Sequence, residues 1–265
     1  MSLCVGFNVF SGLELLKPSI NNAREFADSI VVVYQTVSNT GNKCQPYMMD
    51  LLSDLKKDGL IDVLINHEPD LKSLTPNKVQ VNNAKKRNAV RSVCLKKNID
   101  YFMCKDCDEF YKKDQFEKAF NFIKKGGYDC SLSKLIEYQY KPIYQNRSLS
   151  GTLAPFILKS TVPFTLNCKM KYRVDPARRF IGKKFYLFPD KDLLMHHMTV
   201  VRYDTSELSH KYMNHSWYDK GKYIKQQMSN FTKIDPNQFK ILEEDSFGIL
   251  DYWENEFCKY KNIQS

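Results

Sequence analysis

Short apolar runs alternate with one-faced helical patterns along the first part of the chain. The runs at Leu3–Phe10, Ser29–Gln35 and Ile61–Asn66 predict strands. Ser29–Gln35 is the clearest buried one, because it is β-branched, uncharged and short. A helix interrupted by Pro18 is expected over residues 13–26, and methionine and leucine spacing predicts a second helix over residues 48–58. Strands that alternate with helices in this way predict parallel βαβ units with right-handed crossovers.

The middle of the chain continues this alternation less regularly. A helix is expected from about Val79 to Lys97, and another around Phe116–Ile123 that Gly126 and Gly127 stop. Further segments are then expected as strands at 128–140, 151–159 and 162–164, with an irregular region at 141–150.

From about Lys169 the sequence becomes denser in charged and aromatic residues. Asp204-Thr205-Ser206-Glu207 resembles a capping box, which predicts a helix from Thr205 to about Tyr218. The remaining tail is polar and is expected to be helical. We therefore expect an α/β domain over residues 1–204 and a helical C-terminal extension packed on it over 205–265.

Candidate chemistry centres on Tyr101–Phe110, an apolar run that ends in two aspartates. Asp106 and Asp108 are two residues apart, so on an extended backbone their side chains point the same way. They would converge beyond the carboxyl end of a buried strand, where open α/β sheets bind ligands. A divalent cation would relieve their repulsion, and magnesium-type ions are completed by substrate phosphates and water. Acidic pairs in loops are also often merely solvated.

The helix before this strand brings cations toward the acidic pair. Lys86 and Arg87 lie on it, and Arg87 shares a stripe with the apolar Val90 and Cys94. Helices in βαβ units begin near the carboxyl ends of the strands. We therefore predict that Arg87 contacts a phosphate or base, which its rigid guanidinium suits.

The formal net charge of +10, from 40 Lys and Arg against 30 Asp and Glu, favours anionic partners. The positive charge is spread along the chain without a basic tail, which argues against a dedicated nucleic-acid-binding module. Such a module nevertheless remains one alternative function.

Eight scattered cysteines form no disulfide framework, and the N-terminus lacks a signal-peptide pattern. Cys104 and Cys107 have no second cysteine pair or nearby histidine to complete a zinc site. No stretch approaches the length of a membrane span. A cytoplasmic protein with reduced thiols follows as the expectation.

Four blocks of sequence resemble nucleotide-sugar glycosyltransferases of the GT-A fold, near the family 2 group. They are Asn8-Val9-Phe10, Lys86-Arg87-Asn88, Asp106-Cys107-Asp108, and His196-His197-Met198 with Val201-Arg202. The resemblance implies a Rossmann-like, mostly parallel sheet flanked by helices. It also implies metal-dependent transfer of a single sugar from a nucleoside diphosphate sugar, with a UDP-sugar as the expected donor, to a glycan or other hydroxyl acceptor.

The resemblance also assigns roles to residues. Asp108 would bind Mn²⁺ or Mg²⁺ directly, and Asp106 would contact ribose or metal-bound water. His197 or His196 would complete the metal shell; only one can, because neighbouring strand residues face opposite sides. The nucleotide would meet the ends of the first two strands, and the expected nucleotide-binding residues are Asn8, Val9, Phe10, Gln35, Arg87 and Asp106. Gln35 departs from the acidic residue common at its position.

An inverting enzyme needs a carboxylate to accept the proton of the acceptor hydroxyl. Asp175, flanked by cations, is the first candidate and Glu137 the second. The charge of the leaving diphosphate would be stabilised by cations, for which Arg87, Arg178, Arg179 and Lys183 are candidates. The main alternative is a sugar-phosphate nucleotidyltransferase. Those enzymes usually carry a Gly-rich, Arg-bearing loop after the first strand, where this chain has only Ser11-Gly12.

Overall fold

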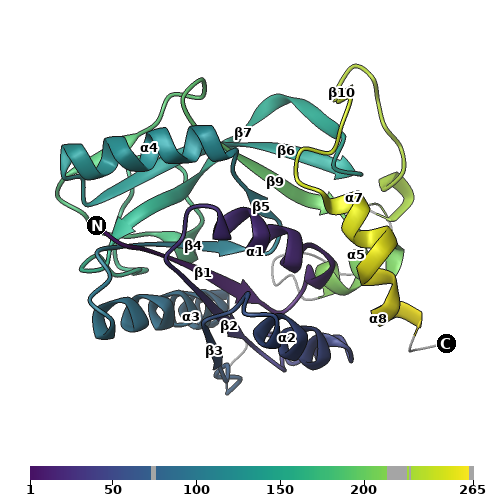
Figure 1. Ribbon diagram of the computed structural model, residues 1–265, viewed down its shortest axis with the longest axis horizontal. Helices are drawn as coiled ribbons and strands as arrows, with labels where there is room; N and C mark the ends of the chain where they lie inside the picture. Colours follow the sequence, from purple (N-terminus) through teal and green to yellow (C-terminus); the bar gives the residue numbers. More distant parts are fainter. Residues whose placement is uncertain (73–75, 214–225, 227, 263–265) are drawn as a thin grey trace.

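The computed structural model describes residues 1–72, 76–213, 226 and 228–262 (Figure 1). Its strands are β1 (Leu3–Val9), β2 (Ser29–Tyr34), β3 (Val63–Asn66), β4 (Tyr101–Asp106), β5 (Glu109–Phe110), β6 (Cys130–Tyr140), β7 (Tyr144–Lys159), β8 (Phe185–Leu187), β9 (Leu194–Val201) and β10 (Phe239–Ile241). Its helices are α1 (Leu16–Arg24), α2 (Met48–Lys57), α3 (Pro76–Lys96), α4 (Lys113–Gly126), α5 (Thr205–Met213), α7 (Ile249–Tyr252) and α8 (Cys258–Asn262), with 3-10 turns η1 (Leu13–Leu15) and η2 (Pro176–Arg178) and a π-helical turn η3 (Trp253–Phe257).

The strands form one ten-stranded sheet, which confirms the predicted α/β class. Its main path runs β3-β2-β1-β4-β7-β6-β9-β5, with β10 paired to β7 and β8 paired to β6. The first four strands are mutually parallel. The chain moves outward from β1 to β3, then α3 carries it back to β4 on the other side of β1. This reversal leaves a crevice at the carboxyl ends of β1 and β4, where Asn8 and Asp106 are register partners.

The second half of the sheet brings a later strand to the acidic turn. β6 and β7 form an antiparallel hairpin, and β9 runs parallel to β6. The two-residue β5 pairs with β9, so that Glu109 lies opposite His197. The histidine strand is thereby fixed beside the turn that carries Asp106 and Asp108.

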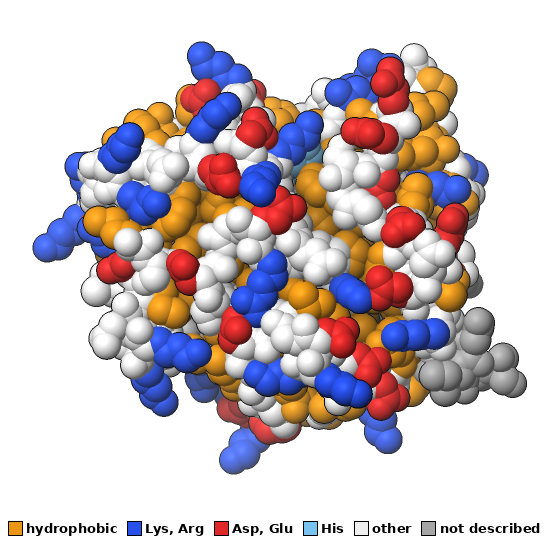
Figure 2. Space-filling model, in the orientation of Figure 1, with side chains coloured by type: hydrophobic (Ala, Val, Ile, Leu, Met, Phe, Trp, Pro, Cys, Tyr) orange, Lys and Arg blue, Asp and Glu red, His pale blue; other side chains and the backbone are white. Residues whose placement is uncertain are grey.

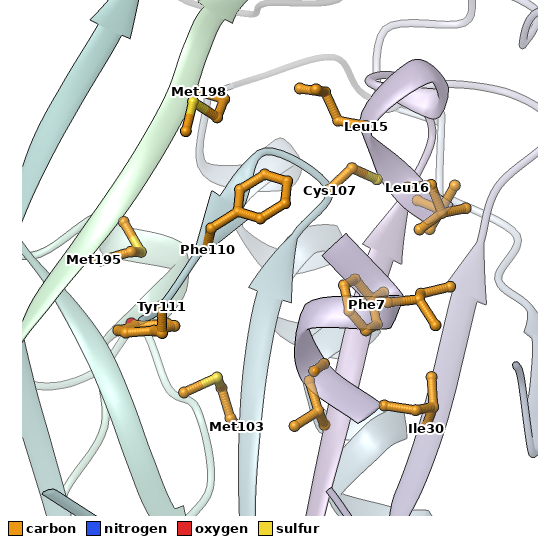
Figure 3. Packing of buried hydrophobic residues seen from close by; sticks show 14 of the residues in the cluster. Phe7, Leu15, Leu16, Ile30, Met103, Cys107, Phe110, Tyr111, Met195 and Met198 are labelled. Carbon is orange, nitrogen blue, oxygen red and sulfur yellow. The ribbon is translucent and has the colours of Figure 1, made fainter. Parts of the chain in front are cut away.

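Side chains that alternate along the central strands pack into two hydrophobic cores, one on each face of the sheet. Phe7, Ile30 and Met103 pack with α1, α2, α4 and the C-terminal helices. Figure 3 shows part of this core, where Phe110 and Met198 from paired strands lie near Cys107. On the other face, side chains such as Phe102 pack with Val90 and Cys94 of α3. Helices therefore cover both faces, as parallel strands require.

Gly6 lets α3 lie close to β1. A Cβ atom built on Gly6 would stand only 2.4 Å from both γ-carbons of Val90. Val90 follows Lys86 and Arg87 by about one helical turn, so this close approach sets how far those cations extend over the end of the sheet.

Several expectations about individual segments are wrong. Residues 144–150, expected to be irregular, belong to the long strand β7. Residues 162–164 form no strand, and Phe164 makes only an isolated bridge to Phe180. The tail is not wholly helical because β10 pairs with β7. The helix expected over 205–218 is described to Met213, and its remainder lies outside the described residues.

The described part of residues 205–265 packs on the same core. Five of its buried side chains belong to the same hydrophobic cluster as side chains of β1 and α1; they are Ile249, Tyr252, Trp253, Phe257 and Tyr260. The indole nitrogen of Trp253 donates to the carbonyl oxygen of Glu14 at 2.8 Å. Within the described ranges, no helix combines the length and the apolar character needed to cross a membrane.

Candidate functional site

A pocket of about 430 Å³ opens at the carboxyl ends of β1, β2 and β4. Side chains of α3, β7, η2, β9 and α5 complete its walls. It lies at the point where the strand order reverses, which is the expected ligand site of such a sheet. Of the predicted site residues, those that line it are Asn8, Phe10, Gln35, Arg87, Asp106, Asp108, Asp175 and His197.

Asp106 ends β4 and is held by two guanidinium groups. Arg87 of α3 and Arg178 of η2 lie 3.2 Å and 2.5 Å from its two carboxylate oxygens. Burial would raise the pKa of Asp106, but Arg178 and Arg87 outweigh it and hold that pKa below the ordinary value. Arg178 also pairs with Glu109, a buried residue of the acidic turn that the sequence did not single out.

Asp108 lies two residues further on and has its own set of partners. Its Oδ2 accepts hydrogen bonds from Arg202 at 2.8 Å and Lys211 at 3.0 Å. Its Oδ1 lies 3.7 Å from Nε2 of His197. Burial would raise the pKa of Asp108, yet Lys211, His197 and Arg202 together hold it well below the ordinary value. The carboxylate is therefore ionised at neutral pH.

The two adjacent histidines face opposite sides of β9. His197 lines the pocket beside Asp108. His196 lies in the core, where its Nδ1 meets the hydroxyl of Tyr138 at 2.8 Å and its ring packs against Phe247. Burial lowers the pKa of His196 to about 4, so it is neutral at physiological pH. Only His197 is placed to share a ligand with Asp108.

Two other predicted residues do not line the pocket. The side chain of Val9 is buried in the core, and its carbonyl oxygen accepts a hydrogen bond from the amide of Gln35. Glu137 lies on β6 in register with His197 but outside the pocket lining. Asp175 does line it, and its carboxylate accepts a hydrogen bond from the amide of Ala177 at 2.7 Å.

Lys211 of α5 is a cation of the site that no sequence pattern indicated. Its ammonium group donates to Asp108 and to both oxygens of Thr199, and it lines the pocket. Among the arginines and lysines proposed for the leaving group, Arg87 and Arg178 line the pocket, but Arg179 and Lys183 do not. Lys86 lines it too, and burial lowers its pKa to about 8.

The carboxylate and imidazole fit a small divalent cation as a partial ligand set. Across the described residues, no group of three or more His, Cys, Asp or Glu side chains is arranged to enclose a metal. Asp108 Oδ1 nevertheless lies 3.7 Å from His197 Nε2. The other oxygen of Asp108, Oδ2, accepts hydrogen bonds from Arg202 and Lys211. Two protein ligands suit an ion that keeps water and substrate oxygens in its shell, and imidazole favours manganese over magnesium.

No family model and no curated protein matches the sequence. Among solved structures, S. aureus TarS is similar at 12% identity over 89% of this chain and 45% of TarS, with a TM-score of 0.47. TarS 1-349 in complex with UDP-GlcNAc is similar at 14% identity, covering 86% of this chain and 70% of that one, with a TM-score of 0.46. The synthetase of CMP:2-keto-3-deoxy-manno-octonic acid, complexed with CTP, is similar at 9% identity, covering 57% of this chain and 64% of that one, with a TM-score of 0.33. This chain spans less than half of the full TarS chain. Likenesses at this level leave the function to be argued from the site itself.

Proposed function

We propose that this protein is a metal-dependent glycosyltransferase that moves one sugar from a nucleoside diphosphate sugar, most simply a UDP-sugar, to a hydroxyl acceptor. The observation that carries the proposal is the pairing of Asp108 with His197 in a pocket at the reversal point of the sheet. The lining offers both the amide side chains of Gln35, Asn39 and Asn83, which hydrogen-bond to one another, and charged groups such as Asp106 and Arg178. A nucleotide, which carries a base at one end and phosphates at the other, suits such a lining.

Mn²⁺ or Mg²⁺ would be held by Asp108 and His197, and when bound it would offset the charge that grows on the departing diphosphate. Arg202 and Lys211 fix the orientation of Asp108 through its other oxygen. Arg202 is itself buried and also contacts Glu14 at 3.3 Å, so the position of Asp108 is set from within the core.

Lys211 would supply the second positive charge for the leaving group. Its three short contacts hold the ammonium group still at the pocket wall, so little reorganisation is needed when negative charge develops nearby. Arg178 would act in the same way, and Asp106 and Glu109 already orient it.

Asp175 is our candidate for the base that accepts the acceptor's proton. It is exposed, lies on the pocket wall formed by η2 and is oriented by the amide of Ala177. An acceptor hydroxyl could therefore approach it from solvent while the donor occupies the deeper part. Glu137 is less well placed because it does not line the pocket.

The test is the manganese-dependent hydrolysis of a panel of UDP-sugars by the purified protein. The wild type should release UDP, and Asp108→Asn should lose at least about 100-fold in rate, a typical cost of removing one key electrostatic group. Asp114→Asn, on the exposed surface of α4, is the matched control and should keep the full rate. Pyrophosphate release from a nucleoside triphosphate and a sugar phosphate, without UDP release, would instead identify a nucleotidyltransferase.

A further inference from the structure

Four polar side chains form an unbroken hydrogen-bonded line along one wall of the pocket. Nζ of Lys86 donates to Oε1 of Gln35 at 2.6 Å, and Nε2 of Gln35 donates to Oδ1 of Asn39 at 3.1 Å. Nδ2 of Asn39 then donates to Oδ1 of Asn83 at 2.8 Å. All four residues line the pocket.

The direction of this line is dictated by its first member. An amide alone can present either its oxygen or its nitrogen, since the two ends are alike in shape. An ammonium group can only donate, so Lys86 must face the oxygen of Gln35. The nitrogen of Gln35 then requires an oxygen on Asn39, and the nitrogen of Asn39 requires an oxygen on Asn83. Turning any one amide would set two donors against each other.

The line therefore ends in a fixed donor. With its oxygen bound to Asn39, Asn83 has its Nδ2 left over, and no acceptor among the described residues binds that nitrogen. Asn83 is half-buried and lies one turn before Arg87 on α3. Arg87 binds Asp106, so Asn83 lies about one helical turn, roughly 5 Å along the helix, nearer the start of α3 than the residue that binds this carboxylate.

We infer that Asn83 reads the base of the nucleotide, and that the pocket selects a base with an exocyclic carbonyl over one with an exocyclic amine. This inference rests on the proposed function, because it assumes that a nucleotide occupies the pocket. The carbonyl at position 4 of uracil accepts from Nδ2, whereas the amino group at the same position of cytosine would meet it donor to donor. A buried donor without an acceptor makes the second complex weaker.

The test compares the dissociation constants of UDP and CDP by calorimetry, in the presence of Mn²⁺. These ligands share ribose and diphosphate and differ only on one edge of the base. The wild type should bind UDP at least about tenfold more tightly than CDP, the factor that corresponds to one unsatisfied hydrogen bond. Equal affinities, or a preference for CDP, would overturn the inference and leave the proposed function standing. Binding of neither nucleotide would overturn both.

Asn83→Asp keeps the shape of the side chain but turns the donor into an acceptor. The order should reverse in this variant, with CDP bound more tightly than UDP. Asn121→Asp adds the same charge on the exposed face of α4 and should keep the wild-type ratio. Lys86→Met removes the anchor, so the amides can turn and the ratio should fall toward one without reversing. An unchanged UDP preference in Asn83→Asp would show that the donor lies elsewhere.

Discussion

Asp106 and Asp108 are the residues around which the site is built, and each is neutralised by cations from other elements. Arg87 and Arg178 pair with the first, and Arg202 and Lys211 with the second. A buried carboxylate without such partners would be costly, so the protein can hold both ionised before any ligand binds. The spacing of the two aspartates predicted that they would share one pocket. Their partners could not be predicted, because they come from positions far apart in sequence.

Lys211→Met removes a positive charge from the pocket, together with the hydrogen bond that Lys211 donates to Asp108, but keeps both proposed metal ligands in the chain. We expect its rate of UDP-sugar hydrolysis to fall by about 10- to 100-fold, because one fixed charge beside the leaving group is lost. Steady-state kinetics measure this, with Lys118→Met as the control because that lysine side chain is 81% exposed. If the variant hydrolysed the UDP-sugar as fast as the wild type, Lys211 would not stabilise the leaving group.

The depressed pKa values of Asp106 and Asp108 also predict how stability depends on pH. Both folded-state pKa values lie below the usual 3.8. The stability that these groups contribute is therefore complete above about pH 4 and is lost as the pH falls through the folded-state values. Melting temperatures measured between pH 6 and pH 3 should fall less steeply in Asp108→Asn than in the wild type. Parallel curves would show that the ion pairs of Asp108 add nothing to stability.

At the scale of elements, the sequence predicted the helices and strands whose formation depends on residues close together in the chain. Apolar patterns and glycine caps predicted three of these elements: the strand at Ser29–Tyr34, the helix at Met48–Lys57 and the helix ending at Gly126. β7 was missed over its first part because residues there are mostly polar and half-exposed, and pairing with β6 and β10 makes them a strand. A three-residue strand such as β10 carries too little pattern to be seen in the sequence.

Gly6→Ala tests the contact that positions α3. The added methyl group would overlap Val90, so α3 must shift away from β1 and carry Asn83, Lys86 and Arg87 with it. We expect a loss of about 1–3 kcal/mol in the free energy of unfolding and weaker UDP binding. Denaturant titration and calorimetry measure the two effects.

Gly151→Ala provides the matched control, since its added methyl group would meet no atom within 4 Å. Its free energy of unfolding should stay within about 0.5 kcal/mol of the wild type. If Gly6→Ala behaved in the same way, the close packing of α3 on β1 would not be what sets the position of the cations.

For the whole molecule, the net charge of +10 is not gathered into one surface on the face that Figure 2 shows. Lysine and arginine side chains there are interspersed with aspartate and glutamate. Inside the pocket, the lining cations Lys86, Arg87, Arg178 and Lys211 are matched by Asp106, Asp108, Glu109 and Asp175. The cations of the pocket are therefore balanced by carboxylates before a ligand binds, and a bound metal cation can engage some of these carboxylates.

The C-terminal segment helps to hold this arrangement together. Lys261 of α8 pairs with Glu207 of α5, and Tyr260 donates to Asp54 of α2. Figure 1 shows α8 beside α5, the helix that carries Lys211. The sequence showed the capping box at the start of α5, but it could not show that the far end of the chain returns to fix this helix.

The most direct test of the account is a crystal structure of the protein soaked with MnCl₂ and UDP, with anomalous scattering used to locate manganese. We predict one anomalous peak within bonding distance of Asp108 Oδ1 and His197 Nε2, about 2.0–2.3 Å from each, bridged to the diphosphate. A map with UDP bound elsewhere, or with UDP in this pocket and no manganese at these two atoms, would contradict the proposed site.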